Sequence, residues 1–184
     1  MNQSNKEYLQ LLFLSGVHTF QKEKANNFLN LTKNKVYTND RLEKKDLSEI
    51  NNISNLVSFI AQHNSELKKT ANNLVVFDGN ISSKLMIIGE APGKDEDEQG
   101  IPFVGKAGQL LNKMLAAINV KRESAYVTNV IPWRPPNNRT PTEKEILEFL
   151  PFLQKQIEII KPKNIFVLGL TAAKAILSTP LSLG

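Results

Sequence analysis

Short apolar runs alternate with helical patterns of hydrophobic residues through the second half of the chain. Three runs have the length and the apolar content of buried strands. They are residues 84–88, 125–131 and 164–168. Helical spacing of hydrophobic residues follows each run, over 107–118, from 141 to about 160, and over 171–177. Strands that alternate with helices predict an α/β fold with a parallel sheet covered on both faces.

The N-terminal part has a different pattern. Hydrophobic positions within 8–20 predict a short helix, whereas 21–45 is rich in Lys and Asn and predicts a solvated linker. A second helix is predicted from Asp46 to residue 63 or 64, with its apolar side chains on one face. We therefore expect residues 1–66 to form a helical extension with a linker, and residues 67–184 to form the α/β domain.

The boundaries of the later elements carry local signals. Residues 132–141 are rich in proline and predict an irregular loop. Thr140 and Glu143 have the spacing of a capping box, and Pro141 then falls at the first helical position. These residues predict the start of the helix that runs to about residue 160.

Composition narrows the range of functions. Lys and Arg number 23 against 18 for Asp and Glu, so the net charge of +5 is compatible with an anionic partner such as DNA. The 184 residues include no cysteine, which excludes disulfides and cysteine-ligated metal sites within this chain. The chain shows no apolar run of about 18 residues and no apolar signal core, so we expect a cytoplasmic protein without a membrane partner.

Loops at the carboxyl ends of parallel strands normally form the functional site. In the first such loop, 89–105, Glu90 directly follows a predicted strand and lies between glycines that allow a sharp turn. In the second, Asn129 ends a strand, and its amide has the donor and acceptor needed to read a pyrimidine edge. Arg134 and Arg139 follow on the proline-rich loop and are candidates for phosphate contacts. The alternatives are an ordinary connecting loop at 89–105, a buried structural amide at Asn129, and solvated side chains for the two arginines.

The segment 100–107 also approaches a phosphate-binding loop, because it reads G-I-P-F-V-G-K-A. Ala107 stands where the magnesium-binding hydroxyl is needed, and Pro102 removes an N–H from the supposed cradle. The preceding strand also ends too early. Nucleoside triphosphate binding is therefore the weakest of the functional alternatives.

Read in order, the loops resemble a known family. G-E-A-P-G, G-I-P-F-V-G-K-A-G-Q-L-L, T-N-V and R-P-P-N-N-R-T-P-T follow one another from residue 89 to residue 142. This combination resembles the uracil-DNA glycosylase superfamily, specifically its family-4 type, from about residue 67 onward. The resemblance implies a three-layer αβα sandwich with a short parallel sheet. It also implies hydrolysis of the bond between uracil and deoxyribose in DNA.

Residue roles follow from the resemblance. Glu90 is the implied catalytic acid, Phe103 stacks on the flipped uracil, and Asn129 reads its edge and is counted as catalytic too. Glu96 is implied to line the pocket near the base, where Gly89 and Gly93 contribute backbone. Arg134, Asn138 and Arg139 are the expected DNA contacts, on the proline-rich loop. No metal site is expected.

Two departures from the family's pattern set further expectations. The family usually holds an iron–sulfur cluster on four cysteines, but residues 63–66 and Trp133 stand where cysteines belong. We therefore expect no cofactor. A later His-Pro motif is absent and the only histidines are His18 and His63, so we expect the final strand and helix of the fold to be missing and one sheet edge to be unpaired. The expected protein is a monomeric glycosylase acting on uracil-containing DNA, and the alternative is a non-catalytic DNA-binding or damage-sensing relative.

Overall fold

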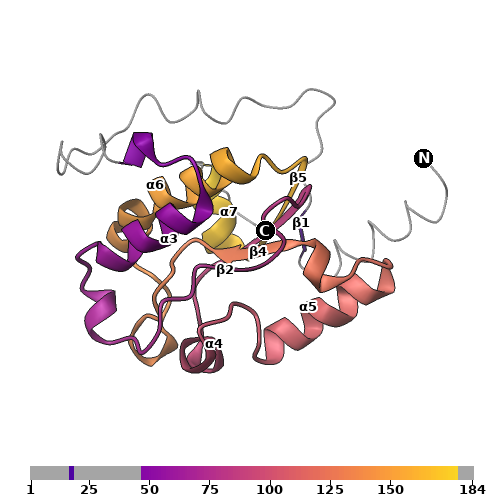
Figure 1. Ribbon diagram of the computed structural model, residues 1–184. Coiled ribbons are helices and arrows are strands. Elements are labelled where there is room, and N and C mark those ends of the chain that lie inside the picture. Colours follow the sequence, from indigo (N-terminus) through magenta and orange to yellow (C-terminus); the bar gives the residue numbers. More distant parts are fainter. Residues whose placement is uncertain (1–16, 19–46, 178–184) are drawn as a thin grey trace.

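The computed structural model describes residues 17–18 and 47–177 (Figure 1). Its centre is a five-stranded sheet of order β1-β5-β3-β4-β2. The strands are β1 (Val17–His18), β2 (Phe77–Gly79), β3 (Leu85–Gly89), β4 (Tyr126–Asn129) and β5 (Asn164–Leu168). Strand β3 is parallel to both β4 and β5, whereas β1 and β2 pair antiparallel at the two edges.

Helices cover both faces of this sheet. They are α3 (Ile53–Gln62), α4 (Lys94–Gln99), α5 (Lys106–Ala117), α6 (Glu143–Ile160) and α7 (Leu170–Leu177). Three short 3-10 turns lie at Leu67–Lys69, Arg122–Ser124 and Pro136–Asn138. Helices α3, α6 and α7 pack on one face and α5 on the other, as the separated helical layers in Figure 1 show. The three-layer α/β class predicted from the sequence is confirmed.

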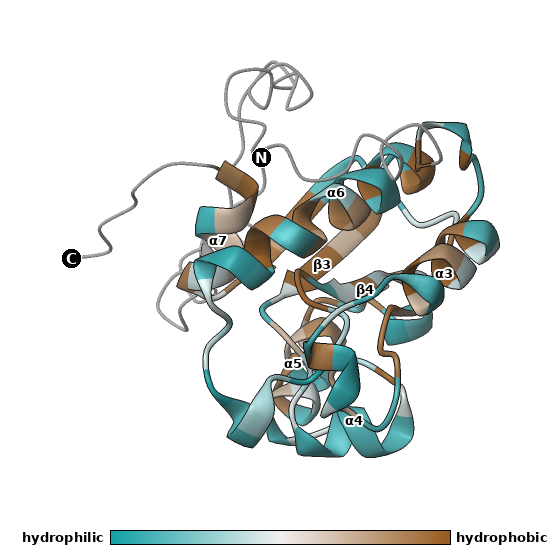
Figure 2. Ribbon diagram, turned by 90° about the vertical axis from the view of Figure 1, so that its left-hand side faces the viewer, coloured by the Kyte–Doolittle hydropathy of each residue, from teal (hydrophilic) through white to brown (hydrophobic). Residues whose placement is uncertain are grey.

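Alternation along the central strand builds the two cores. Met86 and Ile88 face α3 and α6, whereas Ile87 between them faces Leu111 and Leu115 of α5. All three strand residues are fully buried, and each such aliphatic side chain contributes about 1.5–3 kcal/mol by leaving water. Figure 2 shows the result, with brown hydrophobic strands between helices whose outer faces are teal.

The sheet has two edge strands that the pattern did not predict. Strand β2 is only three residues long, too short to show an alternation of its own. Strand β1 overturns the predicted helix over 8–20 at Val17 and His18, which pair with β5. The remainder of that helix and the linker 21–45 lie outside the described residues. The expectation of an unpaired edge was also wrong, because β1 lies along β5.

The second N-terminal helix is shorter than predicted. Residues 47–49 are helical, the helix is interrupted at residues 50–52, and α3 starts after Asn52. The Asn52 side chain accepts a hydrogen bond from the Asn55 backbone N–H at 2.8 Å, which is the geometry of an N-cap and begins a new helix there. Ile53, Leu56 and Ile60 join the same core as the sheet. The proposed boundary at residue 66 stays a prediction.

Helix α6 starts two residues later than predicted. Thr142, not Thr140, is the N-cap, and Glu145 completes the capping box. The Thr142 hydroxyl accepts from the Glu145 N–H at 3.3 Å, and the Glu145 carboxylate accepts from the Thr142 N–H at 2.7 Å. Both threonines have the required spacing, but Glu145 also binds Arg139, which favours the later start. Pro141 is therefore outside the helix.

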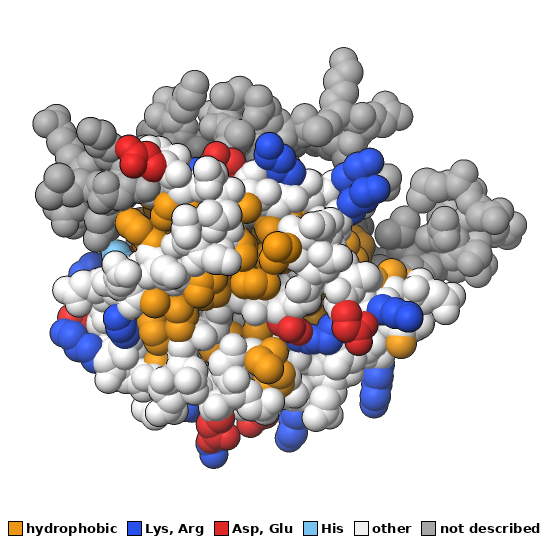
Figure 3. Space-filling model, viewed as in Figure 1, with side chains coloured by type: hydrophobic (Ala, Val, Ile, Leu, Met, Phe, Trp, Pro, Cys, Tyr) orange, Lys and Arg blue, Asp and Glu red, His pale blue; other side chains and the backbone are white. Residues whose placement is uncertain are grey.

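The outer surface separates charge from apolar side chains on the face seen in Figure 3. Hydrophobic side chains gather in the middle of that face, and Lys and Arg are dispersed along its margin. No helix in the described ranges 17–18 and 47–177 is both long and apolar enough to cross a membrane.

Candidate active site

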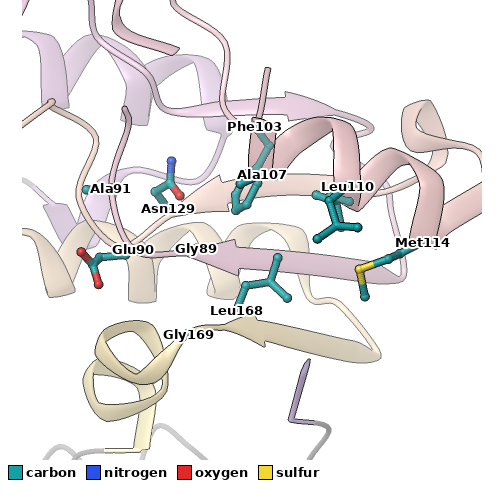
Figure 4. Close-up of a pocket in the computed structure, with 11 residues that line it drawn as sticks. Gly89, Glu90, Ala91, Phe103, Ala107, Leu110, Met114, Asn129, Leu168 and Gly169 are labelled. Carbon is teal, nitrogen blue, oxygen red and sulfur yellow. The ribbon is translucent and has the colours of Figure 1, made fainter. Parts of the chain in front are cut away.

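A pocket of about 360 Å³ opens at the carboxyl ends of the three parallel strands. Its lining comes from the loop after β3, from the end of β4, from the end of β5 and from α5. The lining residues are Gly89, Glu90, Ala91, Phe103, Ala107, Leu110, Leu111, Met114, Asn129, Leu168 and Gly169. Figure 4 shows Phe103 beside Asn129, Glu90 at the end of β3, and Leu110 and Met114 projecting from α5 at the opposite end.

Gly89 forms the floor of the pocket, where the side chains of Phe103 and Asn129 come closest to the backbone. A Cβ atom at this position would lie 2.4 Å from Phe103 Cζ and 2.5 Å from Asn129 Oδ1. Real Cβ atoms do not approach other atoms so closely, so only glycine leaves the ring and the amide both facing this point. The sequence placed these three residues in one site, and the structure brings them together.

The backbone of β4 holds Asn129 in place. The sheet ladder continues past both strands, because Val130 N–H donates to Gly89 C=O at 2.9 Å and Ile131 N–H donates to Glu90 C=O at 3.0 Å. Asn129 is only 4% exposed. Asn129 lines the pocket, and its side-chain amide makes no hydrogen bond to another described residue.

Glu96 and Gly93 do not line this pocket. The Glu96 carboxylate instead accepts hydrogen bonds from three backbone N–H groups, Gly93 at 3.1 Å, Val104 at 2.9 Å and Gly105 at 2.8 Å. These bonds join the beginning and the end of the loop that carries Phe103. Glu96 thus shapes the loop, and the distance in sequence between its partners is the reason that the motif alone did not reveal this.

Helix α4, which sequence reasoning missed inside the first loop, contains a buried acid. Asp97 is fully buried, and its carboxylate accepts from the Asn72 N–H at 2.8 Å, from the Asn72 amide at 2.9 Å and from the Asn73 N–H at 3.1 Å. Arg134 Nη1 lies 3.8 Å from Asp97 Oδ2. A charged side chain can be buried when it is paired and hydrogen-bonded in this way. Asp97 therefore anchors α4 to the chain before β2.

The resemblance to a phosphate-binding loop is not reproduced in the geometry. The N–H groups of Val104 and Gly105, which a phosphate would need, already bind the Glu96 carboxylate. A negative charge at this point repels another anion. The geometry of this loop therefore also disfavours nucleoside triphosphate binding.

The candidate DNA contacts already have protein partners. Arg134 Nε donates to Asn138 Oδ1 at 2.7 Å. Arg139 forms a two-pronged pair with Glu145, with N–O distances of 2.8 Å and 2.6 Å. The hydrogen bonds from Arg139 lower the pKa of Glu145 to about 2, and the same contact raises the pKa of Arg139. These contacts tie the proline-rich loop to itself and to the first turn of α6.

The residues present do not fit an iron–sulfur cluster. No thiolate ligand exists in the chain, and the described residues contain no group of three His, Asp or Glu side chains suited to a metal. Trp133 fills its position with a buried indole that is 6% exposed, and the Lys68 ammonium lies 6.0 Å from its ring centre. At the other expected position, His63 packs edge-on against Phe149 and Phe152 and binds Glu148 at 3.1 Å.

These features define a three-layer α/β domain with a ligand pocket at the carboxyl ends of parallel strands, lined by an aromatic ring, an amide and a carboxylate. The chain belongs to the uracil DNA glycosylase superfamily, whose family model matches residues 76–184. The resemblance first seen in the loop motifs is confirmed.

Several relatives are named Type-4 uracil-DNA glycosylase. The protein of Pyrobaculum aerophilum is 50% identical over 111 residues, which are 60% of this chain and 57% of that protein. The protein of Archaeoglobus fulgidus is 49% identical over 111 residues, 60% of this chain and 56% of its own length. The protein of Thermotoga maritima is 49% identical over 100 residues, 54% of this chain and 52% of its own length. The chain thus spans a little over half the length of these relatives.

Proposed function

We propose that this chain acts in DNA base-excision repair by hydrolysing the N-glycosidic bond of uracil in DNA. The single observation that carries the proposal is the convergence of Glu90, Phe103 and Asn129 on one pocket above Gly89. Further support comes from membership of the superfamily and from relatives whose names state this activity.

Recognition of uracil follows from the pocket's chemistry. A base within a duplex is reached only after it leaves the stack, and stacking and hydrogen bonds then offset that cost. Phe103 offers a flat apolar surface for the base. The Asn129 amide accepts from uracil N3–H and donates to O4. Cytosine reverses both groups, so the buried amide rejects it.

Glu90 is the proposed catalytic carboxylate. Cleavage of the glycosidic bond leaves positive charge on the sugar and negative charge on the departing base. A carboxylate beside the sugar stabilises the cation or orients the attacking water. The hydrogen bond from Ile131 N–H to the Glu90 carbonyl fixes the backbone from which this side chain extends. Neither a metal nor a redox group is needed for this reaction.

The test is uracil release from a uracil-containing oligonucleotide, followed by strand cleavage at the abasic site. We expect measurable but weak release by the full chain, since no histidine lies in the described part of the pocket and a missing donor to the leaving base costs roughly 100–1000-fold. Glu90→Ala removes this activity. Asn129→Asp, whose carboxylate does not donate to O4, abolishes uracil binding or relaxes the rejection of cytosine. Equal release by wild type and Glu90→Ala would refute the assignment.

A non-catalytic, damage-sensing protein is the second candidate. It is favoured by the position of His63, which lies between α3 and α6 with Glu148 and not at the pocket. A sensor binds DNA but releases no uracil. Uracil release separates the two candidates, whereas binding of labelled DNA at increasing salt tests both, because both functions require an affinity that falls as salt rises. Tight binding without release selects the sensor, and no binding at low salt rejects both.

We also propose the finer properties expected from the sequence. Residues 67–184 form the glycosylase-type domain and residues 1–66 its N-terminal extension, of which α3 is docked on the core. The protein works as a cytoplasmic monomer on uracil-containing DNA, with Arg134, Asn138 and Arg139 nearest the phosphates. It carries no iron–sulfur cluster, since it has no cysteine.

A further inference from the structure

Phe103 has a backbone conformation that an aromatic residue rarely adopts. Its φ angle is +55°, in the left-handed region that favours glycine. Such a conformation persists only where the surroundings impose it, and it is often found where a side chain must be aimed at a ligand. Neighbouring groups must therefore hold Phe103 in this state, with its ring over Gly89.

Arg122 supplies two hydrogen bonds to the backbone of this turn. Its guanidinium donates to the Pro102 carbonyl at 2.6 Å and to the Phe103 carbonyl at 3.1 Å. On the other side of Phe103, Glu96 accepts from the next two N–H groups, those of Val104 and Gly105. A cation therefore holds the carbonyls on one side of the turn and an anion holds the amides on the other.

Arg122 is itself fixed to the rest of the fold. Its Nε donates to Asp78 Oδ2 at 2.9 Å, and its Nη1 also donates to Asn112 Oδ1 at 3.0 Å. Asp78 lies on β2 opposite Val127 of β4, two residues before Asn129. The side chain of Arg122 is 18% exposed, so solvent competes little for these bonds. Through Arg122 the loop with the ring is tied to the strand pair that carries the amide.

We propose that Arg122 is a positioning residue for the Phe103 ring. It does not line the pocket and acts through the carbonyls of Pro102 and Phe103. The planar guanidinium reaches several acceptors in fixed directions, which a lysine ammonium does not do. This role rests on the proposed function, because the ring it aims is the stacking surface for uracil. A purely stabilising ion pair with Asp78 is the alternative.

The first experiment needs no substrate. Hydrogen exchange of the Val104 and Gly105 amides is measured by mass spectrometry in the full chain, in Arg122→Gln and in the milder Arg122→Lys. Lys155→Gln is the matched control, because Lys155 is also a largely buried cation in an ion pair, with Glu158 on α6. We expect exchange to accelerate about tenfold or more in the Arg122 variants and to stay unchanged in the control. Unchanged exchange in the Arg122 variants would overturn the proposal.

The second experiment is a double-mutant cycle on the rate of uracil release. Arg122→Gln alone is expected to slow release by about 10- to 100-fold, as expected for a misplaced binding group. In a Phe103→Ala background the same change is expected to have less than about a twofold further effect, because the ring it positions is gone. Fully additive losses would show a merely structural role and overturn the proposal. Absence of uracil release by wild type, with accelerated exchange in the Arg122 variants, would refute the proposed function. It would leave intact the inference that Arg122 holds the backbone of the turn.

Discussion

At the scale of single residues, the pocket depends on one position that has no side chain. Gly89 ends β3, and its backbone is not in the left-handed region, so its role is space alone. The three atoms that a Cβ would strike belong to the side chains of Phe103 and Asn129, not to backbone. A methyl group here displaces the ring and the amide and leaves the sheet in place.

Gly89→Ala is therefore expected to separate activity from stability. Uracil release should fall by about 100-fold or more, since both recognition groups move by an ångström or so. The midpoint of thermal unfolding, followed by circular dichroism, should stay within a few degrees of wild type, as expected for a shift smaller than about 1 kcal/mol. A large loss of stability, or an unchanged rate of release, would contradict this account of the pocket floor.

At the scale of elements, the start of α6 is held by charge as well as by capping. Glu145 accepts from the Thr142 N–H, as the capping box requires, and it also receives both prongs of Arg139. A negative charge in the first turn of a helix is further favoured by the helix dipole. The proline-rich loop and the helix that follows it are thus joined at one carboxylate.

The low pKa of Glu145 predicts a pH dependence of stability. Hydrogen bonds from Arg139 hold this pKa at about 2, below the ordinary value of 4.5. The stabilisation is therefore complete above pH 4.5 and is lost as pH falls toward 2. We expect Glu145→Gln to lower stability at pH 7 and to reduce the slope of unfolding free energy against pH below 4.5. Urea unfolding at a series of pH values measures both, and an identical acid slope in the variant would contradict the assignment.

At the scale of the whole molecule, large ring side chains occupy the two places where cysteine ligands were expected. The two places where the family's pattern has cysteines hold Trp133 and the segment that begins at His63. Trp133 is buried with Lys68 over its indole, and the half-buried His63 has Phe149 and Phe152 around its imidazole. Burial of these rings contributes to the stability of the fold.

The purified chain is accordingly expected to be colourless and free of stoichiometric iron. The physical reason is the absence of thiolate ligands. Visible absorption and iron analysis check this directly, with protein produced under iron-replete conditions.

In the same region, Trp133→Ala should destabilise the fold by about 3–5 kcal/mol, the usual cost of removing a large buried ring. Stoichiometric iron, or an alanine variant as stable as wild type, would show that this region is held together in another way.

Local sequence determined much of this protein. Strand 164–168 was predicted to the residue, and the central strand and α5 to within one, because their hydrophobic residues have a clear period and clear boundaries. The loop motifs likewise pointed to Glu90, Phe103 and Asn129, and the structure places all three on one pocket.

Tertiary structure decided the remainder, because the partners are distant in sequence. The choice of Thr142 over Thr140 depended on Arg139, and the edge strands β1 and β2 exist only beside β5 and β4. Glu96 was expected to line the pocket near the uracil base, but its carboxylate accepts hydrogen bonds from backbone amides eight and nine residues away. Arg122 reaches a turn 19 and 20 residues earlier, a contact that no local pattern records. Side chains that act through long-range hydrogen bonds leave no periodic signal, and only the folded chain shows what they hold.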